Sequence, residues 1–107
     1  MKLYVSNDSN IETEIIKYLE VFNVVSDIKE ADNVLILPGG LGNFYDLFES
    51  IKLKKKVLVY NKDLYYSSLF KNLFQGYEKG YIEVAPYEFI TIESDFNNII
   101  KNLEDLK

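Results

Sequence analysis

Hydrophobic residues along this chain follow two alternating patterns. Short apolar runs occupy residues 2–5, 23–25, 34–37, 57–60 and 89–92. Between them lie longer segments in which apolar residues recur at helical spacing. Continuous apolar runs are typical of parallel strands that helices cover on both faces. The pattern therefore predicts an α/β fold, a three-layer sandwich around a parallel sheet of about five strands.

The first and the last predicted helix each carry an apolar stripe that we expect in the core. The first begins at Ser9, with Glu12 completing a capping-box pattern. Its stripe comprises Ile11, Ile15, Ile16, Leu19 and Phe22. The last begins near Ser94 or Asp95. Its stripe comprises Phe96, Ile99, Ile100, Leu103 and Leu106.

Two further helices are expected between these, over residues 43–53 and 63–79. Gly80 follows the second of them and suits a left-handed residue after a helix end. No linker, repeat or low-complexity segment interrupts the chain. Residues 1–107 are therefore predicted to form a single domain, which is long enough for one core.

The composition excludes several kinds of catalytic and binding site. The chain has no Cys, His or Trp, and all 12 basic residues are Lys. Disulfides, thiol nucleophiles, Cys or His metal sites and Arg clamps on phosphate are excluded, and we expect neither a metal nor a cofactor. The net charge is −5 and the one basic cluster is residues 52–56, so nucleic acid is not an expected partner. Without a visible signal peptide or membrane-length apolar run, we expect a cytoplasmic protein with no membrane partner.

The stretch "LILPGGLGNFYD", residues 35–46, is the strongest functional signal. Its strand runs into a glycine-rich loop at the sheet edge where α/β proteins bind ligands. Glycines leave room for a ligand to approach backbone N–H groups, which the following helix dipole makes attractive to anions. Predicted ligand-binding residues are Gly39, Gly40, Leu41, Gly42 and Asn43, with Asn43 also the expected N-cap. A plain strand-to-helix turn would explain the same glycines, and local chemistry leaves both interpretations open.

Polar residues after the first strand are expected at the same edge. Ser6, Asn7 and Asp8 could meet a ribose hydroxyl or a base edge there. The alternative is that Asn7 and Asp8 form a turn that leads into the first helix.

The segment "PGGLGNFYD" resembles the P-G-G-x-G-T-x-x-E motif of the Lonely Guy family, part of the Rossmann-like superfamily that includes DNA-processing protein A. "NKDLYYSSL", residues 61–69, followed by Glu78, Gly80 and Ile82, is similar to the second motif of that family. The resemblance covers residues 31–106. It implies a nucleotide-like ligand whose 5′-phosphate lies in the glycine loop, and a homodimer or higher homo-oligomer.

Catalysis in that family uses the motif Glu together with an upstream Arg. Here Asp46 takes the place of the Glu, and the chain has no Arg. The resemblance therefore favours a protein that senses or sequesters a nucleotide-derived molecule without efficient catalysis, as do relatives that sense antiphage defence signals. One alternative is an enzyme that cleaves an N-glycosidic bond with Asp46 as the catalytic carboxylate, a phosphoribohydrolase or a nucleoside deoxyribosyltransferase-like protein. Another is a structural or protein-interaction module.

Overall fold

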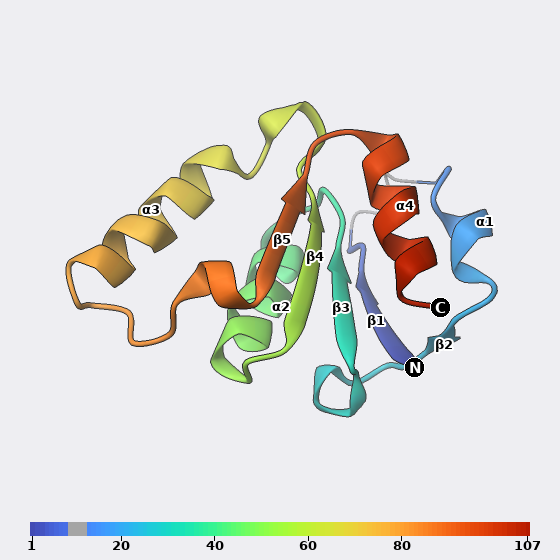
Figure 1. Cartoon of the computed structure of the whole chain (residues 1–107), viewed down its shortest axis with the longest axis horizontal. Coiled ribbons are helices and arrows are strands. Elements are labelled where there is room, and N and C mark those ends of the chain that lie inside the picture. Colours follow the sequence, from blue (N-terminus) through green and yellow to red (C-terminus); the bar gives the residue numbers. More distant parts are fainter. Residues whose placement is uncertain (9–12) are drawn as a thin grey trace.

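A five-stranded parallel sheet forms the centre of the computed structural model, which describes residues 1–8 and 13–107 (Figure 1). The strands are β1 (Lys2–Ser6), β2 (Asn23–Val24), β3 (Asn33–Ile36), β4 (Lys56–Tyr60) and β5 (Ile90–Glu93). Their order in the sheet is β2-β1-β3-β4-β5, and every neighbouring pair is parallel. The predicted α/β sandwich with a parallel sheet is confirmed.

The central strands are apolar on both faces, which explains their continuous hydrophobic runs. In β3, Val34 and Ile36 contribute to one core cluster, and Leu35 contributes to the other. β4 divides in the same way, with Val57 on the first side and Leu58 on the second. Side chains on a strand alternate between faces, so a strand covered on both sides needs an apolar residue at every position.

Helices form the outer two layers. They are α1 (Ile16–Leu19), α2 (Leu41–Lys52), α3 (Ser67–Glu78) and α4 (Phe96–Asp105). In Figure 1, α1 and α4 lie in front of the sheet, α2 lies behind it, and α3 lies beyond β5. Short 3₁₀ turns are η1 (Ile28–Glu30), η2 (Lys62–Leu64) and η3 (Pro86–Glu88).

Two predicted helices differ from the observed ones at their N-terminal ends. α2 begins at Leu41 with Gly40 as its N-cap, so the predicted start at Asn43 and its role as N-cap are wrong. The predicted helix 63–79 is interrupted because Asp63 and Leu64 adopt φ values of 54° and 60°. Left-handed residues cannot continue a right-handed helix, so α3 begins only at Ser67.

The remaining helix ends agree better with expectation. Gly80 has φ 80° directly after α3, which confirms the predicted left-handed position. Asp95 caps α4 by accepting a hydrogen bond from the Asn97 N–H at 2.9 Å, which settles the choice between the two predicted starting residues.

The structure describes only part of the first predicted helix. Its predicted capping pair Ser9 and Glu12 lies outside the described residues, as does Ile11. Ile15 and Leu19 are buried, but Ile16 is 45% exposed, so its predicted place in the core is wrong. α1 is a single turn, and adjacent residues on one turn cannot both face the sheet.

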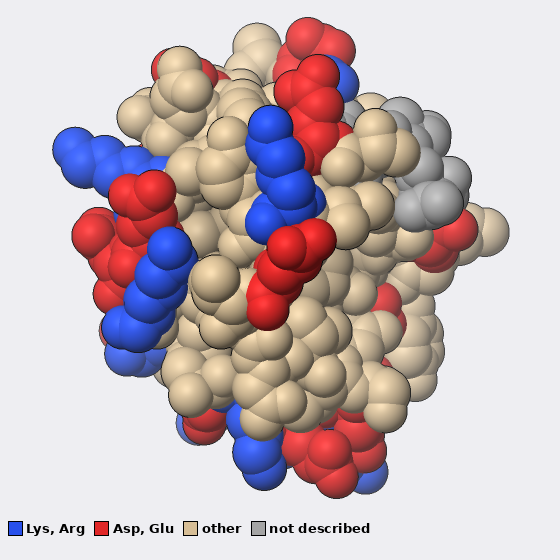
Figure 2. Space-filling model, turned by 90° about the vertical axis from the view of Figure 1, so that its right-hand side faces the viewer, with Lys and Arg blue, Asp and Glu red and all other residues tan. Residues whose placement is uncertain are grey.

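The surface carries both signs of charge. Figure 2 shows Lys and acidic side chains interspersed with uncharged surface on the side of the molecule that includes α1. Within residues 1–8 and 13–107, none of the helices has the length and apolar character needed to span a membrane.

Candidate functional site

The candidate site is the crevice where β1 and β3 end. β2 lies on one side of β1, and β3 to β5 lie on the other, so the chain reverses its direction of travel across the sheet between β1 and β3. Open α/β sheets bind ligands at the carboxyl ends of the two strands that flank such a reversal. The Leu37 N–H donates to the Ser6 carbonyl at 3.0 Å, which aligns the two strand ends. Residues 6–8 and 38–42 therefore lie together at this edge.

Asn43 links the ends of β1 and β3 to the first turn of α2. It is fully buried in the first turn of α2. Its Nδ2 donates to the carbonyls of Ser6 at 3.0 Å and Leu37 at 2.6 Å. Its Oδ1 accepts from the Asp8 N–H at 2.9 Å. Because one buried amide satisfies backbone groups from both strand ends, it fixes their position relative to α2.

The glycine loop holds a carboxylate of its own chain. Asp8 Oδ1 accepts from the Gly40 N–H at 2.9 Å, and Asp8 Oδ2 accepts from the Gly42 N–H at 2.9 Å. Both N–H groups lie at the start of the 12-residue helix α2, where the dipole favours negative charge. Asp8 is exposed. Two N–H groups of the loop therefore converge on one carboxylate, which belongs to an exposed side chain of the same chain.

Two of the three glycines lie in close contact with the side chains that enter the loop. A Cβ at Gly39 would overlap the side chains of Asn43 and Asp8. A Cβ at Gly42 would lie 2.7 Å from Asp8 Oδ2. At Gly40 the nearest atom would be 3.5 Å away, an ordinary contact. Close contact with side chains thus accounts for the absence of a Cβ at Gly39 and Gly42, but not at Gly40.

Asp46 lies in the second turn of α2 and is bonded to β1. Its Oδ2 accepts from the Tyr4 hydroxyl at 3.0 Å and from Ser6 Oγ at 2.7 Å. Burial, assisted by the bond to Asp46, raises the pKa of Tyr4 to about 12. The carboxylate predicted as catalytic therefore links α2 to two hydroxyls of the sheet.

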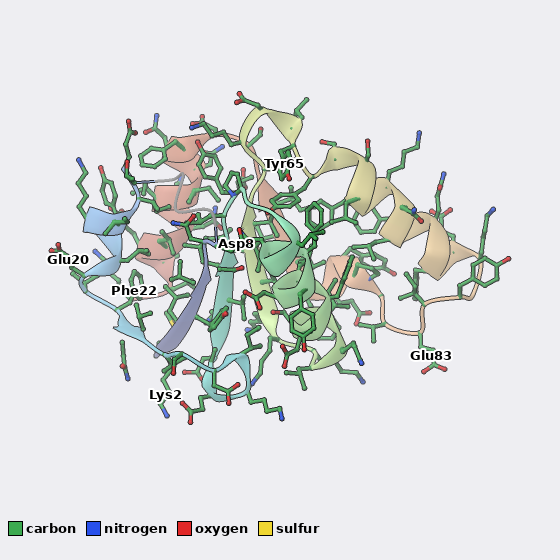
Figure 3. The ribbon with its side chains drawn as sticks, turned by 180° about the vertical axis from the view of Figure 1, so that it is seen from behind. Lys2, Asp8, Glu20, Phe22, Tyr65 and Glu83 are labelled. Carbon is green, nitrogen blue, oxygen red and sulfur yellow. The ribbon has the colours of Figure 1, made fainter. Side chains whose placement is uncertain are left out.

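Two tyrosines that directly precede α3 donate hydrogen bonds to carbonyls at the glycine loop. The Tyr65 hydroxyl donates to the Gly39 carbonyl at 2.8 Å, and the Tyr66 hydroxyl donates to the Leu37 carbonyl at 2.6 Å. Burial raises the pKa of Tyr66 to about 12. Figure 3 labels Tyr65 and Asp8, which both lie at this end of the sheet. The Gly39 carbonyl thus bonds to Tyr65, while the N–H groups of Gly40 and Gly42 bond to Asp8.

No protein-family model and no curated protein matches this chain. The similarity to the Lonely Guy motifs therefore rests on the residues quoted above. Within the described residues, no group of three or more carboxylates is placed to hold a metal ion.

Most of the predicted site residues come together in the crevice. These are Ser6, Gly39, Gly40, Gly42, Asn43 and Asp46. Two differ in their surroundings: Leu41 is 82% exposed, and Asn7 is half-buried between the last residue of β1 and Asp8. Ser6 is buried with its hydroxyl donated to Asp46.

The sequence places Asp8 at this edge but does not predict its bonds to the loop, nor the bonds that Tyr4 and Tyr65 make. Asp8 is expected there as a ligand contact or as part of a turn, whereas in the structure it accepts from the loop N–H groups. It follows β1 by two residues, and its charge suits a helix N-terminus. Its position after β1 and its negative charge together were the signal that could have identified Asp8 as the partner of the loop. Nothing in the sequence pairs Tyr4 with Asp46, because the two are 42 positions apart.

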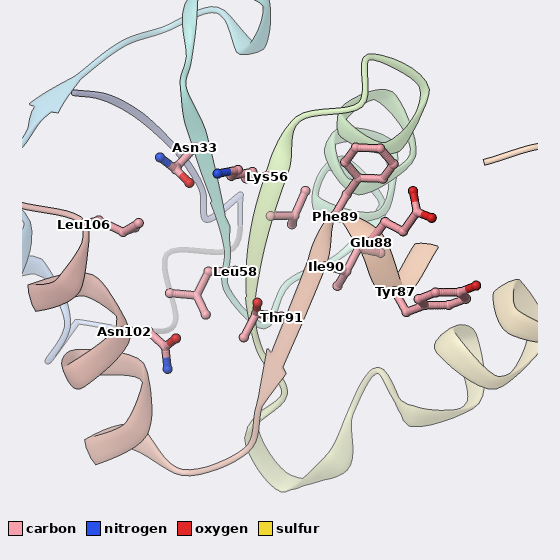
Figure 4. A pocket seen from close by; sticks show the side chains of 11 residues that line it. Asn33, Lys56, Leu58, Tyr87, Glu88, Phe89, Ile90, Thr91, Asn102 and Leu106 are labelled. Carbon is pink, nitrogen blue, oxygen red and sulfur yellow. The ribbon is translucent and has the colours of Figure 1, made fainter. Parts of the chain in front are cut away.

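A separate groove lies at the opposite end of the sheet. It has a volume of about 290 Å³, and Figure 4 shows the side chains that line it. Asn33, Lys56 and Ile90, the first residues of β3, β4 and β5, are among them. The length of the strands therefore separates this groove from the glycine loop.

Proposed function

We propose that the protein binds a nucleotide-derived small molecule through the loop at residues 38–43 and senses or sequesters it, without processing it efficiently. The observation that carries this proposal is the convergence of the Gly40 and Gly42 N–H groups on one carboxylate. A phosphate group offers the same oxygen acceptors with more negative charge. The resemblance to the Lonely Guy family supports a nucleotide as the source of that phosphate.

Binding in this mode requires Asp8 to leave the loop. Two negative groups cannot share the same pair of donors, and Asp8 is exposed, so its side chain can turn toward solvent. The phosphate then takes over the N–H groups that Asp8 releases. The free energy of releasing Asp8 is subtracted from the ligand's affinity, as for any protein whose competent state is only partly populated.

The surroundings of Asp46 support binding over cleavage. Hydrolysis of an N-glycosidic bond needs a carboxylate that faces the developing cationic sugar and a group that assists the leaving base. Asp46 is engaged by two hydroxyls of β1, and the chain has no Arg for the second role.

The proposed homodimer has a candidate surface on α2. Leu41, Tyr45 and Phe48 follow one another at helical spacing and are 82%, 67% and 41% exposed. Apolar side chains at this spacing form one stripe on the helix. If two copies meet there, Tyr45→Glu should convert a dimer into a monomer in light-scattering measurements, while Tyr81→Glu, on the loop after α3, should not.

The binding proposal is tested by mixing the purified protein with AMP, other nucleoside monophosphates, ADP-ribose and cyclic nucleotides. After ultrafiltration, mass spectrometry of the filtrate and of the heated retentate shows which compound was held and whether it is intact. We expect one nucleotide to be retained and recovered unchanged. Gly40→Asp adds a second carboxylate to the loop and should lower the affinity of the protein for the retained nucleotide at least about tenfold. Asn98→Asp, which adds the same charge on α4, is the matched control.

Each other outcome points elsewhere. Free base or ribose 5-phosphate in the filtrate would indicate an enzyme, and loss of that activity in Asp46→Asn would assign the catalytic carboxylate. Unchanged affinity in Gly40→Asp would overturn the role of the loop. Retention of no nucleotide at all would favour the structural or protein-interaction module.

A further inference from the structure

A hollow walled by aromatic rings lies between α3 and η3. It has a volume of about 430 Å³ and is lined by Phe74, Tyr77, Glu78 and Tyr87, which we call the aromatic hollow. This volume falls in the range of small-molecule pockets, about 300 to 1,000 Å³. Because the residues come from the C-terminal half of α3 and from the turn before β5, the hollow is separate from the glycine loop.

The walls of the hollow are held by contact between two tyrosines. The rings of Tyr77 and Tyr87 meet edge to face with centroids 5.9 Å apart. A hydrogen bond with Tyr77 raises the pKa of Tyr87 above its ordinary value. Figure 4 shows Tyr87 extending from η3 toward α3. Tyr87 is nevertheless 63% exposed, so most of its surface is not used in packing.

The charges around the hollow are mainly negative. Glu78 lines it directly. A neighbouring hollow of about 380 Å³ shares Tyr77 and adds Glu83 and Glu88, opposed by Lys54. Three carboxylates against one ammonium leave this surface with an excess of negative charge, in a protein whose net charge is already −5. A cation is therefore the complementary ligand.

We propose that the aromatic hollow binds a small quaternary ammonium compound, whose methylated head lies against Tyr77, Tyr87 and Phe74 with Glu78 balancing its charge. Aromatic faces attract cations through their quadrupoles, and a methylated ammonium is large, weakly hydrated and apolar on its surface. Such a head group gains both from ring contact and from the nearby carboxylate. An inorganic cation would have to give up its water for rings that offer no lone pair.

The test uses choline and its neutral isostere 3,3-dimethylbutan-1-ol as probes with the full chain. Aromatic NMR signals of the two tyrosines and Phe74 are followed during titration. We expect choline to produce saturable shifts and the isostere to bind at least about tenfold more weakly, because only choline carries the charge. Tyr87→Leu and Glu78→Gln should each lower the choline affinity about fivefold.

Matched variants separate this role from packing. Tyr87→Phe retains the ring and should bind choline within about twofold of the wild type. Tyr81→Leu, an exposed tyrosine outside the hollow, should leave binding unchanged. Equal binding of the isostere, absence of saturable shifts, or undiminished affinity in Tyr87→Leu would overturn the proposal. So would tighter binding of a blocked lysine, which would identify the hollow as a site for a protein side chain.

Discussion

The glycine-loop crevice and the aromatic hollow are built from different parts of the chain. In the crevice, backbone N–H groups define the site, and buried side chains such as Asn43 fix their positions. In the hollow, side chains form the walls themselves: Glu78 and Tyr87 are exposed, and Phe74 and Tyr77 are half-buried. We propose an anion as the ligand of the first arrangement and a cation as the ligand of the second. The difference shows how one small fold can present two opposite kinds of surface.

The largest expected effect is on the free energy of unfolding, which should fall much more for a variant in the crevice than for one in the hollow. Asn43→Leu leaves the carbonyls of Ser6 and Leu37 and the N–H of Asp8 without their buried partner, and should lower the free energy of unfolding by about 3 kcal/mol. Tyr87→Leu, on the exposed wall of the hollow, should change it by no more than about 0.5 kcal/mol. Urea unfolding of both variants measures the contrast. Equal losses of unfolding free energy in the two variants would contradict this contrast between the crevice and the hollow.

A second contrast lies within the glycine loop itself. Gly39→Ala forces a Cβ into the Asn43 and Asp8 side chains and should cost about 2 kcal/mol of stability. Gly40→Ala meets only an ordinary contact and should cost at most about 1 kcal/mol, mainly through its N-cap position. Thermal unfolding of the pair provides the measurement. If both variants were equally stable, close approach would not explain the glycine at position 39.

The proposed competition between Asp8 and a phosphate gives a smaller but opposite effect. Asp8→Asn removes the charge that an incoming phosphate must displace, and should raise the affinity for the retained nucleotide about tenfold. The matching nucleoside, which lacks the phosphate, should bind the two proteins equally. Calorimetric titration of both compounds measures this. A fall in nucleotide affinity would mean that Asp8 helps to bind the ligand.

The smallest expected effect concerns pH. Tyr4 titrates at about 12 in the folded protein and at the ordinary value of 10.0 when unfolded. Below pH 10.0 both states hold the proton, and above it the unfolded state releases the proton first, so stability falls as pH rises toward about 12. Tyr4→Phe should lessen this fall, whereas Tyr81→Phe, on the exposed loop after α3, should not. Urea midpoints at about pH 9 and about pH 11 compare them. An unchanged slope in Tyr4→Phe would exclude Tyr4 as its source.

The amino-acid sequence alone determined the strands, the sheet type and the position of the glycine loop. These features depend on local chemistry: continuous apolar runs specify buried parallel strands, and Asp95 caps α4 through a neighbour two residues away. Local chemistry also explains the misjudged helix ends. A left-handed conformation at Asp63 and Leu64 has no strong signal when neither residue is glycine.

Only the tertiary structure decided what occupies the glycine loop. The order β2-β1-β3-β4-β5 places the end of β1 beside the end of β3, and so brings Asp8 to Gly40 and Gly42 across more than 30 positions of the sequence. The aromatic hollow depends in the same way on how α3 and η3 pack together. Hydrogen bonds and ring contacts between distant residues follow from strand order and helix packing, which no local pattern of hydrophobic residues specifies.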